Sequence, residues 1–354
     1  MVSVLIVTWN SAQYLQSCCA SLDRQDYRDL EVVVIDNAST DGTREFLRSS
    51  EPKWRVIYND RNVGFAAGQN QAIHAAKGDL LLCLNPDVVL AGDFVGRLVE
   101  AASEHNEAGS ICGKLLRWDP ENKPHQTRTI DSTGIYFTRN MRHLDRGAEE
   151  TDNGQYDSAQ YVFGATGAAA LFRRSFVEAV SVDGEFFDED FFSYREDADL
   201  AWRAQVMGWK CVYTPAAVAW HVRRVTPERR EQLPVAINWH SIKNRFLMRG
   251  KNASGWLCRK LIWPVAWRDL MIVGYAVVRD RRMISAVLYP WKVRASVRRK
   301  RAIIQSRRKV ADRDLIWWFH DTPRAVEVKQ STAMSHMSDS PELAANPSIT
   351  GDRP

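Results

Sequence analysis

The sequence predicts an α/β protein built on a doubly wound, mostly parallel sheet. Short apolar, β-branched runs alternate with segments of helical spacing about every 25 residues through the first 115 residues. Polar clusters follow three of the apolar runs, at 8–10, 36–43 and 85–87. In sheets of this class, ligands bind beyond the carboxyl ends of the strands. We therefore expect the three clusters to converge on one crevice.

Each expected element follows from its local pattern. Strands are predicted at 2–8, 31–35, 54–58, 79–84 and 110–116, with helices at 11–21, from 43, at 65–77 and at 91–104. Residues 117–160 have few apolar positions and are expected to form polar loops. Regular structure is expected again at 161–172, followed by a helix at 197–207 and a strand at 211–221.

Charge divides the chain into an acidic body and a basic segment. The formal net charge is +5, yet residues 249–309 hold 17 Lys or Arg and two acids, so the remainder carries a net charge of −10. We therefore expect one folded domain at 1–230, in which the alternating strand and helix pattern of 1–115 gives way to a less regular half at 116–230. A basic helical extension at 231–325 and a disordered tail at 326–354 should follow.

The first candidate binding segment is Asp36-Asn37-Ala38-Ser39-Thr40-Asp41-Gly42-Thr43, which follows the second predicted strand. A carboxylate at the end of a strand can accept hydrogen bonds from a nucleobase or a ribose. Asp41 and Thr43 also suit the first turn of a helix, and Gly42 permits a tight bend. The segment fits either nucleotide binding or ordinary turn and capping chemistry.

A second candidate segment runs from Asn62 to Asn70 with the sequence N-V-G-F-A-A-G-Q-N. Small residues allow the N-terminus of a helix to approach a diphosphate closely. The glycines are spaced G-x-x-x-G, which differs from the dinucleotide-binding fingerprint. Close packing of a helix explains the same spacing equally well.

A cation site is expected where Asn85-Pro86-Asp87 ends an apolar strand. Diphosphate chemistry commonly uses a divalent cation held by one or two carboxylates and phosphate oxygens, which makes Asp87 the candidate ligand. His221 closes the last predicted strand, and a helix followed by a strand would return it to the same edge. The alternatives are a plain turn and a structural histidine.

The densest chemical signal is a cluster of six acids between Asp188 and Asp199, interleaved with aromatic residues. Asp199 and Arg203 are four residues apart and can pair on one helix face. Capping and that ion pair leave Asp197 unpaired beside apolar rings. A carboxylate in such surroundings suits a general base.

Together these segments resemble the inverting family 2 glycosyltransferases of the GT-A fold, the nucleotide-diphospho-sugar transferases. The order matches: T-W-N, D-N-A-S-T-D-G-T, N-x-G-F-x-x-G-x-N, N-P-D in place of D-x-D, F-F-x-Y-x-E-D-x-D-L-x-x-R and a late histidine. The resemblance covers roughly residues 1 to 250. It is greatest to rhamnosyltransferase-like members that act on polysaccharide or lipid-linked acceptors.

The resemblance implies a nucleotide-diphosphate sugar donor, a glycan or lipid-linked acceptor, and a divalent cation, Mn²⁺ or Mg²⁺. It implies that 1–230 is the catalytic domain, with a nucleotide-sugar-binding half at 1–115 and an acceptor-binding, catalytic half at 116–230. It implies that Asp87 and His221 bind the cation and that Asp197 is the catalytic base, beside Glu196. The residues expected to contact the donor are Thr8, Asn10, Asp36, Asn37, Asp41, Asn62, Gly64, Phe65, Gly68, Asn70 and Asn85. The neutral Asn85 departs from the D-x-D pattern and weakens the negative charge at the cation.

The reaction implied by the resemblance is one displacement that inverts the anomeric configuration, with L-rhamnose from dTDP-rhamnose as the family-level candidate. The Q-x-x-R-W motif of processive synthases is absent from the sequence, which favours the addition of one or a few sugars. Two other functions stay open. A sugar-phosphate nucleotidyltransferase should carry a glycine-rich loop with a basic residue where Thr8-Trp9-Asn10-Ser11 stands. A non-catalytic, membrane-associated carbohydrate-binding protein would not need Asp87 and Asp197.

The basic segment favours a membrane partner. Its longest uncharged stretch from Leu270 has nine residues, which is too short to span a bilayer. A basic helix with Trp and Tyr suits the surface of an anionic membrane, and a solvated scaffold helix is the alternative. No nucleic-acid motif accompanies the charge, so no nucleic-acid partner is expected. Unpaired cysteines and the absence of a signal-peptide pattern predict a cytoplasmic protein, peripheral at the inner face of the plasma membrane.

Overall fold

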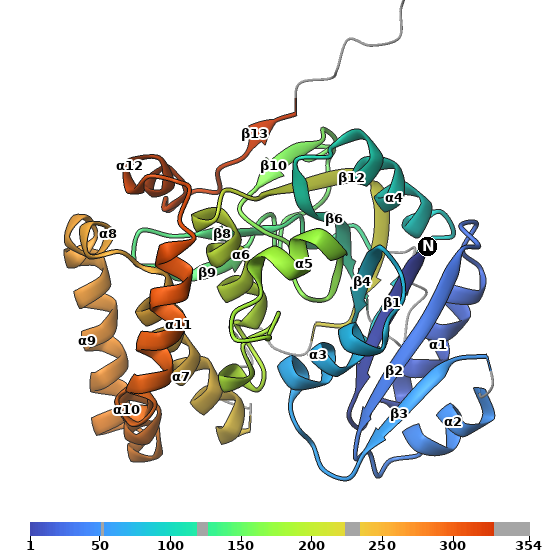
Figure 1. The fold of residues 1–354 in the computed structure, drawn as a ribbon, viewed down its shortest axis with the longest axis horizontal. Coiled ribbons are helices and arrows are strands. Elements are labelled where there is room, and N and C mark those ends of the chain that lie inside the picture. The colour runs from blue at the N-terminus through green and yellow to red at the C-terminus, as the bar shows by residue number, and fades with distance from the viewer. Residues whose placement is uncertain (51–52, 119–126, 224–233, 329–354) are drawn as a thin grey trace, which may run out of the picture.

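The computed structural model describes residues 1–50, 53–118, 127–223 and 234–328 (Figure 1). The strands of its main sheet are β1 (Val2–Thr8), β2 (Leu30–Asn37), β3 (Arg55–Asn59), β4 (Leu80–Leu84), β5 (Val88–Leu90), β6 (Ala108–Arg117), β7 (Ile130–Ser132), β10 (Gln160–Val162), β11 (Ala169–Arg173), β12 (Lys210–His221) and β13 (Val326–Glu327). Their order is β13-β10-β12-β6-β11-β4-β1-β2-β3, with β5 beside β12 and β7 beside β6. A separate hairpin joins β8 (Ile135–Phe137) to β9 (His143–Asp145).

The sheet is mostly parallel, as the alternating pattern predicts. β1 pairs in parallel with β2 and β4, β2 with β3, and β6 with β12. β11 runs antiparallel between β4 and β6, with Ala169 opposite Leu84. The loop at 165–168, which precedes β11, therefore lies at the carboxyl end of β4.

Helices cover both faces of the sheet (Figure 1). They are α1 (Ala12–Asp23), α2 (Thr43–Ser50), α3 (Phe65–Ala75), α4 (Phe94–Glu104), α5 (Arg174–Val180) and α6 (Glu196–Val206). Alternate residues of β1 enter two cores: Val4 and Ile6 pack with α1, α2 and α4, while Leu5 and Val7 pack with α3, α5 and α6. This two-sided burial explains why β1 reads as a continuous apolar run.

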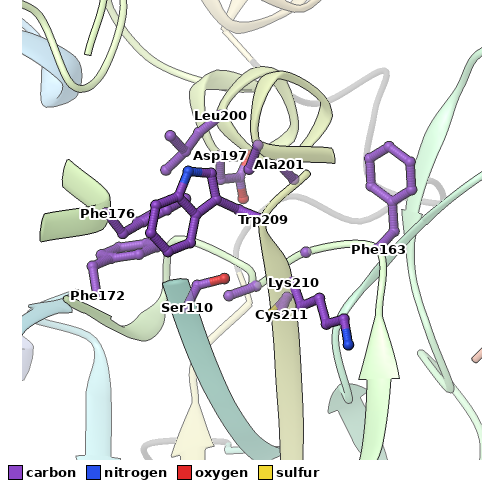
Figure 2. Close-up of a pocket in the computed structure, with 13 residues that line it drawn as sticks. Ser110, Phe163, Phe172, Phe176, Asp197, Leu200, Ala201, Trp209, Lys210 and Cys211 are labelled. Atoms are coloured by element: carbon purple, nitrogen blue, oxygen red, sulfur yellow. The ribbon is translucent and has the colours of Figure 1, made fainter. Parts of the chain in front are cut away.

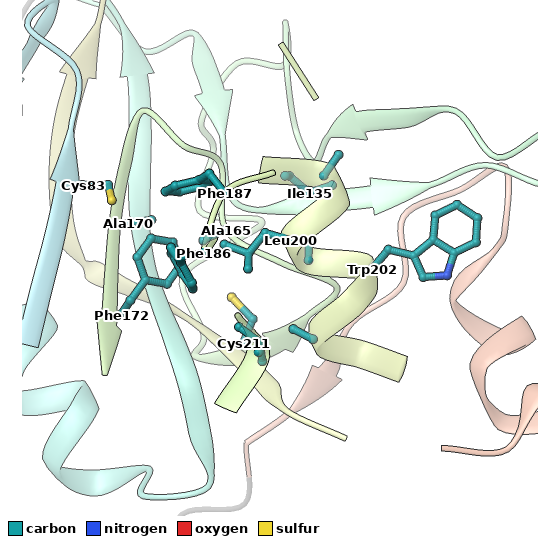
Figure 3. Packing of buried hydrophobic residues seen from close by; sticks show 14 of the residues in the cluster. Cys83, Ile135, Ala165, Ala170, Phe172, Phe186, Phe187, Leu200, Trp202 and Cys211 are labelled. Carbon is teal, nitrogen blue, oxygen red and sulfur yellow. The ribbon is translucent and has the colours of Figure 1, made fainter. Parts of the chain in front are cut away.

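The core beneath α6 is rich in aromatic residues (Figure 3). The rings of Phe172, Phe186 and Phe187 pack against one another. The centroid of Phe186 lies 5.1 Å from Phe172 and 4.8 Å from Phe187, and those of Phe172 and Phe187 are 6.3 Å apart. On the other side of α6, the Trp202 ring lies 5.2 Å from Phe137 and 4.9 Å from Phe319. α6 is therefore held on two sides, and the chain after the basic helices contributes to its packing.

The basic segment folds into helices that pack on the sheet domain. They are α7 (Val235–Asn252), α8 (Gly255–Lys260), α9 (Ile262–Val278), α10 (Ile284–Lys292), α11 (Arg294–Ser306) and α12 (Asp312–Leu315). Short 3-10 turns are η4 (Arg281–Met283) and η5 (Ile316–Trp318) in this segment and η2 (Glu189–Phe191) before α6. Within the described residues, no helix combines the length and apolar character that a bilayer crossing requires.

Two buried lysines join these helices to the acidic cluster. Lys251 Nζ on α7 pairs with Asp188 and lies 3.1 Å from Asp199 Oδ2, and Lys300 Nζ on α11 lies 2.7 Å from Asp188 Oδ1. All four side chains are at most 4% exposed. Part of the basic charge of the extension thus faces inward and neutralises buried acids. The predicted pair of Asp199 and Arg203 is also present, at 3.8 Å.

Several local expectations are wrong. The stretch at 117–160 contains β7, β8 and β9 rather than loop alone, whereas the regular structure expected at 161–172 is present as parts of β10 and β11. β13 pairs with β10 at two residues that the sequence assigns to the disordered tail. The rest of the tail, at 329–354, and the expected domain boundary near 230 lie outside the described residues.

Candidate functional site

The loops that follow β1 and β2 are joined by hydrogen bonds. The backbone N–H of Asn10 donates to Ser39 Oγ at 2.9 Å, and the N–H of Thr40 donates to Asn10 Oδ1 at 2.8 Å. Asn10 has φ 51°, which an asparagine tolerates better than most residues. These contacts bring two of the three predicted polar clusters together at the carboxyl edge of the sheet.

Both aspartates of the second cluster shape its loop. Asp36 is fully buried and accepts hydrogen bonds from Thr8 Oγ1 at 3.1 Å and Arg44 Nε at 2.6 Å. Asp41 is exposed and accepts from Thr43 Oγ1 at 2.6 Å, which is the turn chemistry considered as the alternative. The donor contacts expected of Asp36 and Asp41 stay predictions.

The segment at 62–70 meets β2 and the acidic cluster through Gly64. Asn37 Nδ2 donates to Gly64 O at 3.0 Å, and the Gly64 N–H donates to Asn62 Oδ1 at 2.8 Å. Gly64 has φ 91°, and a Cβ there would lie 2.6 Å from Phe192 O. Only glycine fits this conformation and approach. Phe65, next in the chain, packs its ring 6.0 Å from Phe187.

Two residues of this segment have structural contacts. A Cβ on Gly68 would lie 2.8 Å from Val7 Cγ1, which is the close helix packing considered as its alternative. Asn70 is buried and exchanges hydrogen bonds with the Phe187 backbone, at 2.8 Å to its carbonyl and 3.0 Å from its N–H. Asn70 therefore braces the turn before η2, apart from the loops after β1 and β2. Donor contacts from Gly68 and Asn70 have no support in this geometry and stay predictions.

Asp87 and His221 lie together, as the sequence predicts for cation ligands. β5 pairs with the end of β12, so that His221 lies opposite Val88. His221 Nε2 is 3.5 Å from Asp87 Oδ1, and His221 Nδ1 is 2.8 Å from Asp131 Oδ2. The Asp131 carboxylate thereby orients the imidazole with Nε2 toward Asp87.

The residues at this position fit a divalent cation. Asp87 Oδ1 is buried and has no hydrogen-bond partner among the described residues, and it faces an imidazole nitrogen. An oxygen and a nitrogen ligand suit Mn²⁺, with diphosphate oxygens completing the coordination. Among the residues that the structure describes, no group of three or more His, Cys, Asp or Glu forms a complete metal site.

Asp131 and Arg223 are functional candidates that the sequence does not reveal. Asp131 is 1% exposed on β7, and Arg223 Nε lies 3.1 Å from its Oδ1. Burial opposes ionisation, but the charges of His221, Arg223 and Arg117 lower the pKa of Asp131 overall. Arg223 also pairs with Asp145 on β9. No motif marks these residues, because strand pairing brings Asp131 from a stretch expected to be polar loop to Arg223, which follows β12.

Asp197 lies in the first turn of α6 (Figure 2). Its Oδ2 accepts a hydrogen bond from the Gly167 N–H at 3.0 Å, and its Oδ1 accepts from the Ala198 N–H at 2.7 Å. Burial raises the pKa of Asp197, against the effect of these hydrogen bonds, and the charge of Asp145 raises it further. Asp197 also lines a cavity of about 10 Å³, which holds at most one water molecule.

The loop at 165–168 connects Asp197 to the predicted cation ligands. The Gly167 N–H donates to Asp197, and the carbonyl of the next residue, Ala168, accepts a hydrogen bond from the Asn85 N–H at 2.8 Å. A second connection is electrostatic, because the charge of Arg223 lowers the pKa of Asp197 while Arg223 pairs with Asp131. Asp197 and the turn that ends in Asp87 thus lie at one edge of the sheet.

The family model described as glycosyl transferase family 2 matches residues 3–180 of the sequence. The chain belongs to glycosyl transferase family 2. It is a glycosyltransferase, and this decides against both the nucleotidyltransferase and the non-catalytic carbohydrate-binding alternatives.

Individual relatives support the same assignment. The N-acetylglucosaminyl-diphospho-decaprenol L-rhamnosyltransferase of Mycobacterium tuberculosis is 27% identical over 80% of this chain and 96% of its own length. The poly-β-1,6-N-acetyl-D-glucosamine synthase of Staphylococcus aureus is 22% identical over 62% of this chain and 49% of its own.

Solved structures show the GT-A fold. The crystal structure of GalNAc-T7 with UDP, GalNAc and Mn²⁺ has a TM-score of 0.53 at 15% identity, covering 71% of this chain and 48% of that one. S. aureus TarS has a TM-score of 0.50 at 18% identity, covering 86% and 55%. At these identities the likeness concerns the fold alone, which is the predicted GT-A fold.

Glu196 and Asp197 form the adjacent acid pair of this family 2 enzyme, and their surroundings affect their ionisation. Glu196 is 8% exposed, and its Oε2 has no hydrogen-bond partner among the described residues. Burial, and secondly the charge of Asp197, raise the pKa of Glu196 to about 8. Two adjacent buried carboxyls do not both ionise readily. Near neutral pH Glu196 therefore holds a proton, which removes one negative charge from beside Asp197.

The backbone before the acid pair is strained in a way that the sequence did not predict. Phe192, Tyr194 and Arg195 have φ values of 66°, 70° and 72°, which non-glycine residues rarely adopt. Arg195 Nε donates to Ser241 O on α7 at 2.8 Å, and Phe192 O accepts from the Ala66 N–H at 3.1 Å. These contacts hold the strained turn between α3 and α7 and thereby fix the start of α6.

Proposed function

We propose that this glycosyltransferase moves a sugar, with L-rhamnose from dTDP-rhamnose as our candidate, from a nucleotide diphosphate to a hydroxyl of a lipid-linked glycan. The observation that carries the proposal is the contact of Asp197 with Gly167 and of Asn85 with Ala168. The proposed proton acceptor, Asp197, and the turn that carries the predicted cation ligand Asp87 thus both contact one short loop. The M. tuberculosis relative, named for a rhamnosyltransferase acting on a diphospho-decaprenol carrier, supports this choice of sugar and acceptor.

In this proposal Asp197 removes the proton from the acceptor hydroxyl. The hydroxyl oxygen forms a bond to the anomeric carbon from the face opposite the diphosphate. The bond between that carbon and the diphosphate oxygen breaks in the same step, and the nucleoside diphosphate leaves. One displacement inverts the anomeric configuration, and no covalent sugar–enzyme intermediate forms.

Asp87 and His221 would hold a divalent cation, Mn²⁺ or Mg²⁺, which neutralises charge on the leaving diphosphate when it is bound. Asp131 holds the His221 ring with Nε2 turned toward Asp87. Asn10, Asp36, Asn37, Asp41 and Asn62 would shape the loops that receive the nucleotide. A lipid-linked acceptor would place the reaction at the inner face of the plasma membrane, with the enzyme attached peripherally.

The test is a panel of nucleotide sugars incubated with the enzyme, Mn²⁺ and a short-chain diphosphoprenyl N-acetylglucosamine acceptor. We expect dTDP-rhamnose to give nucleoside diphosphate and an acceptor heavier by one rhamnose, with inverted anomeric configuration. Transfer from a different nucleotide sugar would show that the transferred sugar is not rhamnose. Retention of configuration, or donor turnover that needs neither acceptor nor Asp197, would overturn the mechanism.

A further inference from the structure

The outer face of α9 is apolar and exposed. Trp263 is 82% exposed, Trp267 67% and Leu270 62%, and Val278 at the end of the helix is 79% exposed. Their spacing of three to four residues places them on one side of the helix, together with Gly274. A Cβ on Gly274 would meet no atom within 4 Å, so this side faces open space. In Figure 1, α9 lies at the outer margin of the helical extension.

The opposite side of α9 faces the protein and carries its acid. Ala276 is 1% exposed and packs with Ile242 and Met283. Asp269 lies 3.4 Å from Arg245 Nε and 2.5 Å from Arg249 Nη2, both on α7. The usual order of a surface helix is therefore reversed, with apolar side chains outside and the ion pairs inside.

Exposed cations stand at both ends of this apolar face. Arg259 and Lys260 precede α9, and Arg279, Arg281 and Arg282 follow it. Asp280, the acid within the second group, forms an ion pair with Arg282, with 2.7 Å between Asp280 Oδ1 and Arg282 Nε. In an anionic bilayer, the acyl chains lie below negatively charged headgroups. An apolar helix face can therefore enter the acyl boundary while cations at both ends of the helix contact the headgroups.

A groove between the other helices of the extension offers a place for a headgroup. It has a volume of about 390 Å³ and is lined by residues of α7, α8, α10 and α11, among them Arg249, Trp291 and Arg301. Arg249 Nη1 is buried and has no hydrogen-bond partner among the described residues, and Trp291 is 70% exposed. A guanidinium with a free N–H and an aromatic ring suits the phosphate and the upper acyl chain of a lipid.

We propose that the outer face of α9, with Trp291, lies in the interface of an anionic phospholipid bilayer, parallel to its plane. Trp263 and Trp267 enter the boundary between headgroups and acyl chains, and the cations at both ends of α9 contact the headgroups. The role of this membrane contact rests on the proposed function, because it would hold the enzyme on the same bilayer as a lipid-linked acceptor.

The test is sedimentation of the full-length protein with vesicles of phosphatidylcholine alone and of phosphatidylcholine with 30% phosphatidylglycerol. Full-length protein is needed because Lys251 and Lys300 belong to the buried core. We expect binding to the anionic vesicles that weakens with salt and at least ten-fold weaker binding to the neutral ones. The variant Trp263→Gln/Trp267→Gln should bind the anionic vesicles at least ten-fold more weakly than the wild type.

Trp317→Gln is the matched control, because Trp317 is an exposed tryptophan (40%) outside α9, and it should bind like the wild type. Unchanged vesicle binding by the double variant would overturn the proposal. So would a wild-type dimer in light scattering that the double variant converts to a monomer while neither binds vesicles, since α9 would then join two copies of the chain. Transfer to a water-soluble acceptor is measured in parallel. If the wild type transfers no sugar to this soluble acceptor, the result counts against the proposed function, independently of the membrane assignment.

Discussion

Asp197 combines two properties that are difficult to satisfy together in one side chain. Backbone N–H groups of Gly167 and Ala198 stabilise its charged form, while burial and the nearby charge of Asp145 oppose it. The outcome is a raised pKa in a fixed orientation. A base with these properties accepts a proton more readily than an exposed aspartate does.

Replacing Asp197 should therefore affect turnover and leave donor binding intact. We expect Asp197→Asn to lower kcat by roughly 10²–10⁴-fold, the usual contribution of a general base. Nucleoside diphosphate release measures turnover, and calorimetry with the nucleotide sugar measures binding. A variant with near-normal kcat would remove Asp197 from the role of base.

Asp87 should act through the cation. We expect EDTA to abolish transfer and Mn²⁺ or Mg²⁺ to restore it in the wild type. Asp87→Asn removes the carboxylate charge, and we expect it to need at least ten-fold more Mn²⁺ for half-maximal activity. Titration of activity with Mn²⁺ measures both effects. Full activity of the wild type in excess chelator would contradict a role for a cation.

Glu196 should make stability depend on pH. Its pKa of about 8 in the folded protein exceeds its ordinary value of 4.5, so folding binds a proton between these pH values. The stability that depends on this proton is complete below pH 4.5 and is lost as pH rises toward 8, by at most about 1.4 kcal/mol per pH unit. Glu196→Gln should match the wild type near pH 5 and exceed it by roughly 1–3 kcal/mol at pH 8. Urea unfolding at both pH values measures this, and equal differences would refute the protonated state.

Among the elements, α7 and α11 depend on charge buried against the turn around Asp188. Lys300 Nζ lies 2.7 Å from Asp188 Oδ1 and 2.9 Å from Glu185 Oε2, and its side chain is 4% exposed. Burial opposes this charge, but Asp188 raises the pKa of Lys300 overall. α11 is thus joined to the segment that leads into α6.

Removing one member of this cluster should destabilise the whole protein. We expect Lys300→Met to lower the free energy of unfolding by up to about 3–5 kcal/mol, because the buried Asp188 keeps only Lys251 and Glu185 loses its buried cation. The neighbouring Arg299 is 65% exposed and pairs with Asp183, so Arg299→Met should cost about 0–1 kcal/mol. Chemical denaturation of both variants gives the comparison, and similar costs would show that the Lys300 pairs are not required for stability.

Across the whole molecule, the sequence predicted what depends on local pattern. Strand and helix periodicity placed β1, β2, β4 and β12 closely, because burial on both faces leaves a continuous apolar signature. The meeting of Asp87 and His221 was also predictable, since parallel strands end at one edge. The family motifs added the reaction class to this framework.

Long-range pairing was not predictable from the same patterns. β11 enters antiparallel between β4 and β6, and β7 brings Asp131 to His221 from a stretch that reads as polar loop. Lys251 and Lys300 belong to the basic segment that was expected to face a membrane, yet both are buried. Net charge counts residues without regard to the direction in which they point, and only tertiary contacts reveal that direction.

The peptide groups of Gly167 and Ala168 have a wider consequence. One contacts the carboxylate of Asp197 and the other contacts the turn that ends in Asp87, so covalent geometry sets the spacing between the two sides of the proposed reaction. The surrounding loops can then change to accept another sugar or another carrier, while the spacing between Asp197 and the turn that ends in Asp87 stays the same.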